Sequence, residues 1–267
     1  MAKIKKSKRV QIIAEVGVNH NGSLKLAKKI VKKLSKIDID FIKFQFANPE
    51  LVYSDDSFKA DYQIRNDTEK TVKSMSKKLQ LKAKEHIELA KYCKQNGKKY
   101  ACTAFDTESL RFLLKNINLP FIKIPSGEIV SIDLLKLISK KPKPVILSTG
   151  MATFKEISNC LKIINSKKRK ITIMHCVSSY PAKKEQLNIN VIDNLKEKFK
   201  LPVGYSDHSL SDDACLAAVA KGASFIEKHV TLNKKFSGPD HKMSYSIDIF
   251  LPVLDLIQVI LKSLFQV

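Results

Sequence analysis

Two lysines stand inside apolar runs, where a buried ammonium group needs an anionic partner. Lys43 lies in the run 41–46 and Lys123 in the run 121–124, and the neighbours of both are mostly aromatic or aliphatic. An unpaired charge is costly to bury, so we expect both ammonium groups to serve a ligand. Ser126 follows the second run and adds a hydroxyl group. The two lysines and this turn predict a pocket for a phosphate or carboxylate group.

Further polar groups recur at the ends of apolar runs. Alternation with a period of two puts Gln45 on the same face as Lys43. Hydroxyl groups follow at Thr103 and in the segment 148–150. Each of these is a weak signal alone, because Ser and Thr are common in turns. Their recurrence indicates that they share one site.

Two histidines suggest a metal site. His208 closely follows the run 203–205, and His229 lies at the end of the run 225–230. Neighbouring strands are about 4.8 Å apart, so imidazoles at adjacent strand ends can reach one ion. Two His ligands with waters would suit a Lewis acid. The alternative is that both are hydrogen-bonded polar residues at strand ends. A third histidine, His86, lies in a helical stretch and is expected on the surface.

Carboxylates and an aromatic residue complete the candidate site. Glu15, Glu128, Asp207 and Asp240 follow or end predicted strands, where acids for proton transfer could converge. Asp240 follows a Gly-Pro turn that could direct it across the site. Tyr180 ends the sixth apolar segment and could line a sugar pocket.

The elements that must position these residues are repeated strand–helix units. Eight short apolar runs alternate with longer segments of helical periodicity. The predicted strands are 10–16, 41–46, 100–105, 121–124, 145–147, 171–176, 203–205 and 225–230. Eight such units predict a (β/α)₈ TIM barrel, whose active site lies at the carboxyl ends of the strands. A doubly wound open sheet is the alternative, but no Gly-x-Gly-x-x-Gly motif follows the first strand.

Local signals refine this prediction. Ser23 and Thr153 are expected helix N-caps, and Gly97 is expected to end a helix. The connection 47–81 is much longer than the others, and loops of that length are usually functional. The segment 250–267 is interrupted by polar residues and predicts a packed closing helix rather than a membrane span.

Composition narrows the class of protein. The net charge of +22 comes mostly from lysines spread along the chain, without interleaved aromatic residues. This pattern favours solvated helix faces over nucleic-acid binding. The five cysteines are scattered and never spaced as Cys-x-x-Cys, which indicates free thiols in a reducing cytoplasm.

The ordered set of motifs resembles the sialic acid synthase family, which includes N-acetylneuraminate, legionaminate and pseudaminate synthases. The matching segments are 13–22, 43–45, 123–128, 147–151, 175–181, 204–208, 227–229 and 238–242. The resemblance implies condensation of phosphoenolpyruvate with an N-acetylated amino sugar, such as N-acetylmannosamine or a related hexose, with Mn²⁺ or Mg²⁺ bound. The product would be a nonulosonic acid, and phosphate would leave by C–O cleavage.

The resemblance also implies roles for individual residues. His208 and His229 would hold the metal, and Glu15 with Asp240 would orient the attacking water. The residues implied to hold phosphoenolpyruvate are Lys43, Thr103, Lys123, Ser126, Ser178 and Ser206. Those implied to face the sugar are Gln45, Glu128, Tyr180 and Asp240. The segment 59–63 resembles a part of the family that covers the substrate.

Domain content and partners follow from the same comparison. We expect residues 1–267 to form a single barrel domain, without the C-terminal antifreeze-like domain that family members usually carry. A homodimer and a separate antifreeze-like domain protein are the candidate partners, and neither nucleic acid nor membrane is expected. Two alternatives stay open, namely an inactive barrel that serves as a binding or assembly partner and another phosphoenolpyruvate-dependent aldol-type synthase.

Overall fold

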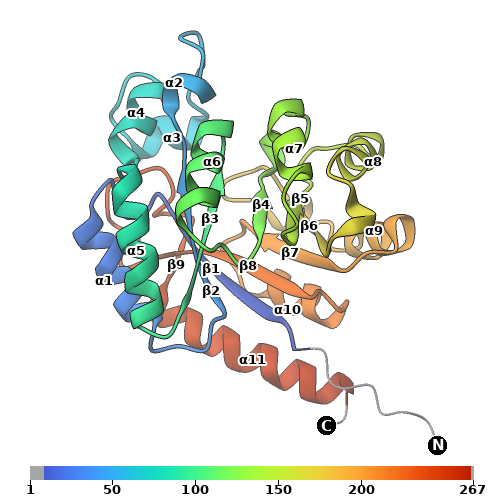
Figure 1. Ribbon diagram of the computed structural model, residues 1–267. Coiled ribbons are helices and arrows are strands. Elements are labelled where there is room, and N and C mark those ends of the chain that lie inside the picture. Colours follow the sequence, from blue (N-terminus) through green and yellow to red (C-terminus); the bar gives the residue numbers. More distant parts are fainter. Residues whose placement is uncertain (1–8, 266–267) are drawn as a thin grey trace, which may run out of the picture.

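Eight parallel strands close into a barrel because β1 pairs with both β2 and β8 (Figure 1). The computed structural model describes residues 9–265. The barrel strands are β1 (Gln11–Gly17), β2 (Phe41–Phe46), β3 (Lys99–Ala104), β4 (Ile122–Ile124), β5 (Val145–Ser148), β6 (Ile171–Cys176), β7 (Val203–Asp207) and β8 (Phe225–Thr231). A short ninth strand, β9 (Tyr245–Ser246), pairs with β8. The predicted (β/α)₈ barrel is confirmed.

Helices connect successive strands and cover the outside of the barrel (Figure 1). They are α1 (Leu24–Leu34), α2 (Pro49–Val52), α3 (Asp61–Asn66), α4 (Val72–Leu79), α5 (Ala83–Gln95), α6 (Thr107–Asn116), α7 (Ile132–Ser139), α8 (Phe154–Ile163), α9 (Val191–Phe199), α10 (Asp213–Ala220) and α11 (Ile247–Phe265). The main hydrophobic core lies between these helices and the outward-facing strand residues.

The barrel interior is apolar toward one end and polar toward the other. The period of two along each strand produces this division, because inward positions lie two residues apart. One inward layer forms a separate apolar cluster of Ile13, Phe41, Ala101, Phe121, Ile146 and Met174, with Phe225 packed against it. The next inward layer, two residues further along each strand, is mostly polar or charged. An apolar floor thus underlies the polar layer.

The structure confirms most of the helix ends that local sequence signals predicted. Ser23 and Thr153 cap α1 and α8 by accepting hydrogen bonds from backbone N–H groups. Gly97 has φ +71° after Asn96, the C-cap of α5, a conformation that favours glycine. The surface prediction for His86 is wrong, because its ring is fully buried and its Nδ1 lies 2.7 Å from the Tyr100 hydroxyl. The helical pattern located the residue, but it did not reveal that this face packs on β3.

The long connection between β2 and α5 folds into three helices, α2, α3 and α4, which lie together at one end of the barrel (Figure 1). At the other end of the chain, the predicted closing helix is α11, although residues 266–267 lie outside the described part. None of the helices within residues 9–265 has both the length and the apolar content of a membrane span.

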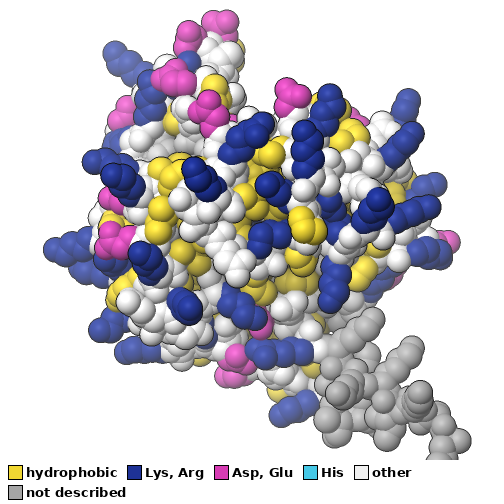
Figure 2. All heavy atoms as spheres, in the orientation of Figure 1, with side chains coloured by type: hydrophobic (Ala, Val, Ile, Leu, Met, Phe, Trp, Pro, Cys, Tyr) yellow, Lys and Arg dark blue, Asp and Glu magenta, His cyan; other side chains and the backbone are white. Residues whose placement is uncertain are grey.

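Basic side chains are spread over the face of the molecule shown in Figure 2 rather than gathered in one patch. Several pair with neighbouring acids, such as Lys184 with Asp213 at 2.7 Å. Exposed pairs of this kind contribute little to stability. This distribution agrees with the interpretation of the charge excess as solvated helix faces.

Candidate active site

A bulge in β1 opens the polar end of the barrel. Glu15 is paired with Lys43, whereas Gly17 is paired with Phe44, so Val16 is an extra residue. Gly17 has φ +55°, and a Cβ atom there would lie 3.4 Å from the Gln45 amide nitrogen. Glycine at this position allows the strand to bend while polar side chains crowd around it.

The polar inward layer lines a cavity of about 120 Å³ at the carboxyl ends of the strands. Each of the eight barrel strands contributes one side chain to the first ring of this lining. The ring consists of Glu15, Lys43, Thr103, Lys123, Ser148, Cys176, Ser206 and Glu227. This is the location that a TIM barrel favours for its active site.

Lys43 lies between two carboxylates. Its Nζ is 2.8 Å from Glu15 Oε2 and 3.5 Å from Glu227 Oε2, and it donates a hydrogen bond to Thr103 Oγ1 at 2.9 Å. Burial alone would lower the pKa of Lys43, but the two carboxylates hold that pKa above its usual value. The two carboxylates therefore favour the charged form of Lys43.

Lys123 is less fully neutralised. Its Nζ donates to Ser148 Oγ at 2.5 Å and is 4.0 Å from Glu227 Oε1. Burial lowers the pKa of Lys123, although Glu227 opposes the shift. The Ser206 hydroxyl also donates to Glu227, at 2.9 Å. An ammonium group with spare donors is suited to receive an anionic ligand.

The two carboxylates of the ring differ in acidity. Burial raises the pKa of Glu15, and Lys43 offsets this rise only in part. The pKa of Glu227 is lowered, because attraction to Lys123 and Lys43 outweighs the effect of burial. Two carboxylates with opposed shifts can divide roles, one as a fixed counter-charge and the other as a proton acceptor.

His208 and His229 lie side by side above this ring, with ring centroids 5.6 Å apart. His208 donates from Nδ1 to the Val177 carbonyl at 2.6 Å, which leaves a lone pair on Nε2, 3.5 Å from the Ser206 hydroxyl. His229 Nδ1 is buried without a hydrogen-bond partner and is 3.8 Å from Asp240 Oδ2. Burial lowers the pKa of both imidazoles, which keeps them neutral as metal ligands must be.

The geometry of these two histidines fits a metal site in which the protein supplies two imidazole ligands. Within residues 9–265 no group of three or more His, Cys, Asp or Glu side chains is arranged to hold an ion. The orphaned His229 nitrogen and the oriented His208 ring nevertheless match the predicted arrangement of two histidines with waters. Metal binding itself stays a prediction.

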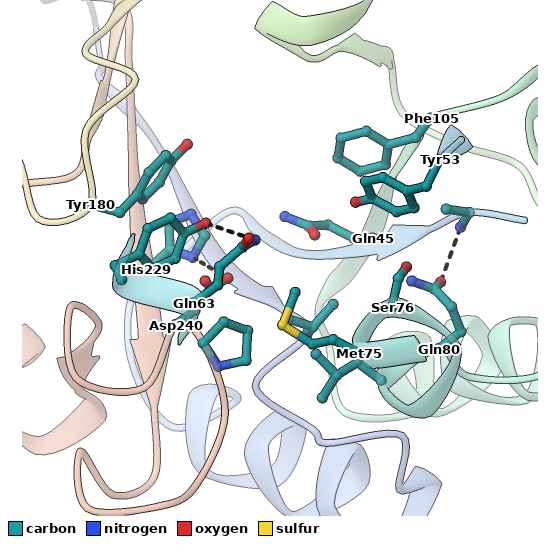
Figure 3. A pocket seen from close by; sticks show the side chains of 15 residues that line it. Gln45, Tyr53, Gln63, Met75, Ser76, Gln80, Phe105, Tyr180, His229 and Asp240 are labelled. Carbon is teal, nitrogen blue, oxygen red and sulfur yellow. Dashed lines mark hydrogen bonds and ion pairs between the residues drawn. The ribbon is translucent and has the colours of Figure 1, made fainter. Parts of the chain in front are cut away.

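A second cavity adjoins the first and is drawn in Figure 3. The two cavities share Gln45, Phe105, Tyr180 and His229. The long connection contributes much of the second cavity, as its length predicted, through Tyr53, Tyr62, Gln63, Met75, Ser76, Leu79 and Gln80. Figure 3 shows Tyr180, His229 and Asp240 on one side and Gln45, Tyr53 and Phe105 on the other. A ligand between these sides would contact both cavities.

Asp240 is held by the loop that follows β8. Its backbone carbonyl accepts from Ser244 Oγ at 2.6 Å, and Ser244 Oγ accepts from Asn19 Nδ2 at 2.8 Å. The same loop contacts α3, because Asn66 Nδ2 donates to the Pro239 carbonyl at 3.2 Å. Burial raises the pKa of the Asp240 carboxyl to about 6. The Gly-Pro turn therefore directs this acid into the second cavity, as expected.

Two of the predicted serines, Ser126 and Ser178, lie beside Gly150, which has φ +49°. A Cβ atom on Gly150 would lie 2.8 Å from both Ser126 Oγ and Ser178 Oγ, so glycine lets the two hydroxyls approach each other. Ser126 and Gly127 line the first cavity, but Ser178 and Glu128 line neither cavity. Ligand contacts of Ser178 and Glu128 stay predictions.

One charged residue of the ring, Glu227, had no predicted role. Glu227 lies between the two ring lysines. Its position two residues before His229 on the same strand could have indicated that it faces the barrel interior. Asp207, by contrast, was expected among the site acids but does not line the cavity. It ends β7 facing outward, because Ser206 and His208 occupy the inward positions on either side.

We expect the protein to lose stability as pH falls below about 6.5. The folded-state pKa is lowered for all six histidines, mainly by burial, and they are His20, His86, His175, His208, His229 and His241. As pH falls through about 6.5, the histidines of the unfolded chain take up protons while those of the folded protein stay neutral. The free energy of unfolding then decreases by about 1.4 kcal/mol for each such proton and each pH unit. The raised pKa values of Glu15, Glu128 and Asp240 oppose this effect, but these are three groups against six histidines.

Urea unfolding of metal-free protein at pH 7.5, 6.5, 5.5 and 4.5 measures this effect. The free energy of unfolding should decrease steadily below pH 6.5. Stability that is constant or rises over that interval would contradict the burial of neutral imidazoles.

Comparisons with known proteins agree with this architecture. A model of the NeuB family matches residues 30–266. N,N'-diacetyllegionaminic acid synthase of Campylobacter jejuni is 44% identical over 241 residues, which are 89% of this chain and 72% of that protein. N-acetylneuraminate-9-phosphate synthase of Homo sapiens is 30% identical over 87% of this chain and 65% of its own length. The crystal structure of N-acetylneuraminic acid synthetase from Leptospira borgpetersenii matches 96% of this chain and 85% of that one, at 33% identity and a TM-score of 0.87.

The fold and the site define a (β/α)₈-barrel enzyme with a pocket lined by lysines and hydroxyl groups beneath two histidines. The matches extend over most of the chain and include relatives well above 30% identity. The chain belongs to the NeuB family, which is the sialic acid synthase family that its motifs resemble.

Proposed function

We propose that this protein condenses phosphoenolpyruvate with an N-acetylated amino-sugar aldehyde to form a nonulosonic acid and release phosphate. The observation that carries the proposal is the pairing of two unlike cavities. One is a small ring with two buried lysines, and the other is a wider space without lysine or arginine. A small anion and a neutral sugar would meet where the cavities join, at Gln45, Tyr180 and His229.

The ring supplies what phosphoenolpyruvate requires. Lys123 retains donors for a carboxylate or phosphate oxygen, and Lys43 adds a second fixed positive charge. Hydroxyl groups of Thr103, Ser126 and Ser206 surround them in the cavity lining. Because these groups are buried and fixed in place, they stabilise anionic charge more strongly than they would in water.

His208 and His229 would hold the divalent metal, Mn²⁺ or Mg²⁺. Such an ion supplies Lewis-acid polarisation of the sugar aldehyde. The fit rests on the oriented Nε2 of His208 and on the buried, unpartnered Nδ1 of His229.

The proposed reaction forms a carbon–carbon bond first. The methylene carbon of phosphoenolpyruvate attacks the aldehyde carbon, and the aldehyde oxygen takes up a proton to become a hydroxyl group. The electron-deficient carbon next to the carboxylate is then captured by water. The resulting tetrahedral intermediate loses phosphate by C–O cleavage, which leaves a ketone.

We assign activation of the attacking water to Glu15 and Asp240. Glu15 lies in the ring below His229, and we assign it to accept the proton of the attacking water. Its raised pKa makes it a better base than an ordinary glutamate. Gln45 donates to Glu15 Oε1 at 3.1 Å and keeps that carboxylate oriented. Asp240 approaches from the sugar side and would orient the same water.

The second cavity favours a neutral sugar. None of its fifteen lining residues is lysine or arginine, and its buried carboxylate, Asp240, would repel a phosphate group. Val18, Met75 and Leu79 provide an apolar side suited to methyl groups of acetamido or deoxy positions. Gln63 and Gln80 provide amide groups beside it.

We therefore expect product with N-acetylmannosamine or a diacetamido hexose, and about 100-fold lower kcat/KM with N-acetylmannosamine 6-phosphate. The factor corresponds to about 2.7 kcal/mol, within the cost of placing like charges together. Mass spectrometry of the sugar acid formed from each candidate measures this. A preference for the phosphorylated sugar would contradict the assignment of the second cavity.

A further inference from the structure

We propose that a buried ion pair outside the barrel wall, between Asp207 and Lys228, positions His208 and His229 and thereby sets the affinity of the site for its divalent metal. Both are positioning residues, since neither faces the cavity. The inference rests on the metal site proposed above.

The ion pair lies directly behind the site. Asp207 on β7 and Lys228 on β8 are paired in the sheet register. Their side chains point outward, so the residues before and after each of them point into the barrel. These four neighbours all line the first cavity, and they are Ser206, His208, Glu227 and His229. A shift or rotation of either strand end at the ion pair would move a histidine.

The ion pair is enclosed and short. Lys228 Nζ is 2.5 Å from Asp207 Oδ2, and the two side chains are 1% and 0% exposed. Lys228 Nζ also donates to the Ser209 carbonyl at 2.7 Å. The Tyr245 ring of β9 lies 4.1 Å from the same Nζ. Lys228 thus joins β8 to the loop that begins with His208 and to β9.

Asp207 also holds the loop that begins with His208. Its Oδ1 accepts from the Ser209 backbone N–H at 2.9 Å and from the Tyr205 hydroxyl at 3.3 Å. Its Oδ2 also accepts from Cys215 Sγ on α10 at 3.2 Å. The residue after His208 is therefore held by its N–H through Asp207 and by its carbonyl through Lys228.

This arrangement explains why a costly buried charge pair is placed here. A buried ion pair often contributes little net stability, and its best-established use is to fix register. Groups that orient metal ligands without touching the metal typically change metal affinity 10- to 100-fold when they are removed. His208 directly follows β7 and His229 lies on β8, and the ion pair joins these two strands next to both histidines.

The test uses the double variant Asp207→Asn with Lys228→Met in the full-length protein. A single change would leave one buried charge unpaired and could prevent folding, whereas the double change leaves none. Lys98→Met is the matched control, because Lys98 Nζ donates to the carbonyls of Ile37 and Ile39 near the start of β3, away from the histidines. Mn²⁺ affinity is measured by electron paramagnetic resonance of the free ion, and phosphoenolpyruvate affinity is measured without metal by calorimetry.

We expect the double variant to bind Mn²⁺ 10- to 100-fold more weakly and to bind phosphoenolpyruvate within about threefold of wild type. The control should retain wild-type Mn²⁺ affinity even if its melting temperature falls. A folded double variant with Mn²⁺ affinity within threefold of wild type would overturn the inference, since the ion pair would then be purely structural.

A second readout separates this inference from the proposed metal site. If Mn²⁺ binding by the wild-type protein does not depend on His208, the proposed metal site is wrong. Nitrogen NMR of the His208 ring then tests the positioning role by itself. The Nδ1–H tautomer, set by the Val177 carbonyl, should lose population in the double variant. An unchanged His208 signal would then overturn the positioning role.

Discussion

Lys123→Met is expected to weaken phosphoenolpyruvate binding by about 30-fold or more. The substitution removes a buried ammonium group that donates to Ser148 Oγ at 2.5 Å and lies 4.0 Å from Glu227 Oε1. It also leaves Glu227 with Lys43 as its remaining cationic partner, so the cavity becomes more negative. Truncating one member of a buried charged contact costs about 2 to 5 kcal/mol, which is roughly 30-fold to several thousand-fold in affinity.

Calorimetric titration with phosphoenolpyruvate in the absence of sugar measures this effect directly. Lys115→Met on the exposed surface of α6 is the matched control and should bind as wild type does. If Lys123→Met bound phosphoenolpyruvate within threefold of wild type, the buried ring would not be the anion site.

Glu15→Gln is expected to lower kcat by about 100- to 10,000-fold, the usual contribution of a positioned general base. Glutamine preserves the shape of the side chain and can still pair with Gln45. It cannot accept a proton from water, and it leaves Lys43 with Glu227 as its anionic partner. The loss should therefore appear mainly in kcat rather than in phosphoenolpyruvate affinity.

The pH profile separates this role from simple misfolding. Burial raises the pKa of Glu15, so activity of wild type should fall on acidification at a pH above the ordinary range of a glutamate. The acid limb assigned to Glu15 should vanish from the residual activity of Glu15→Gln. Glu197→Gln, on the exposed face of α9, is the control for loss of one carboxylate. A Glu15→Gln variant with wild-type kcat would exclude Glu15 as the base.

Strand alternation explains why much of the site could be predicted from the sequence. Lys43 and Lys123 interrupt apolar runs, and a period of two fixes which face each one occupies. Parallel strands in a closed barrel bring these faces to one interior. The same reasoning predicted that His208 and His229 lie together, because they occur at the ends of two adjacent strands.

What the sequence did not reveal depends on contacts between distant segments. The position of Glu227 between both lysines follows from how β8 meets β1 and β7 when the barrel closes. The Asp207–Lys228 ion pair likewise depends on the register of two strands. The residues of α4 that line the second cavity, such as Met75 and Ser76, come from an irregular connection without a fixed period. His86 was misplaced because the helical pattern did not show the packing of α5 against β3.

The most direct test of the proposed reaction is the fate of oxygen in phosphoenolpyruvate labelled with ¹⁸O at the bridging position. The protein is incubated with this substrate, Mn²⁺ and a neutral N-acetylated amino sugar, and the released phosphate is analysed by mass spectrometry. We expect labelled phosphate that requires the sugar and that His208→Ala does not produce. Unlabelled phosphate, or release that is independent of both the sugar and His208, would contradict the synthase account.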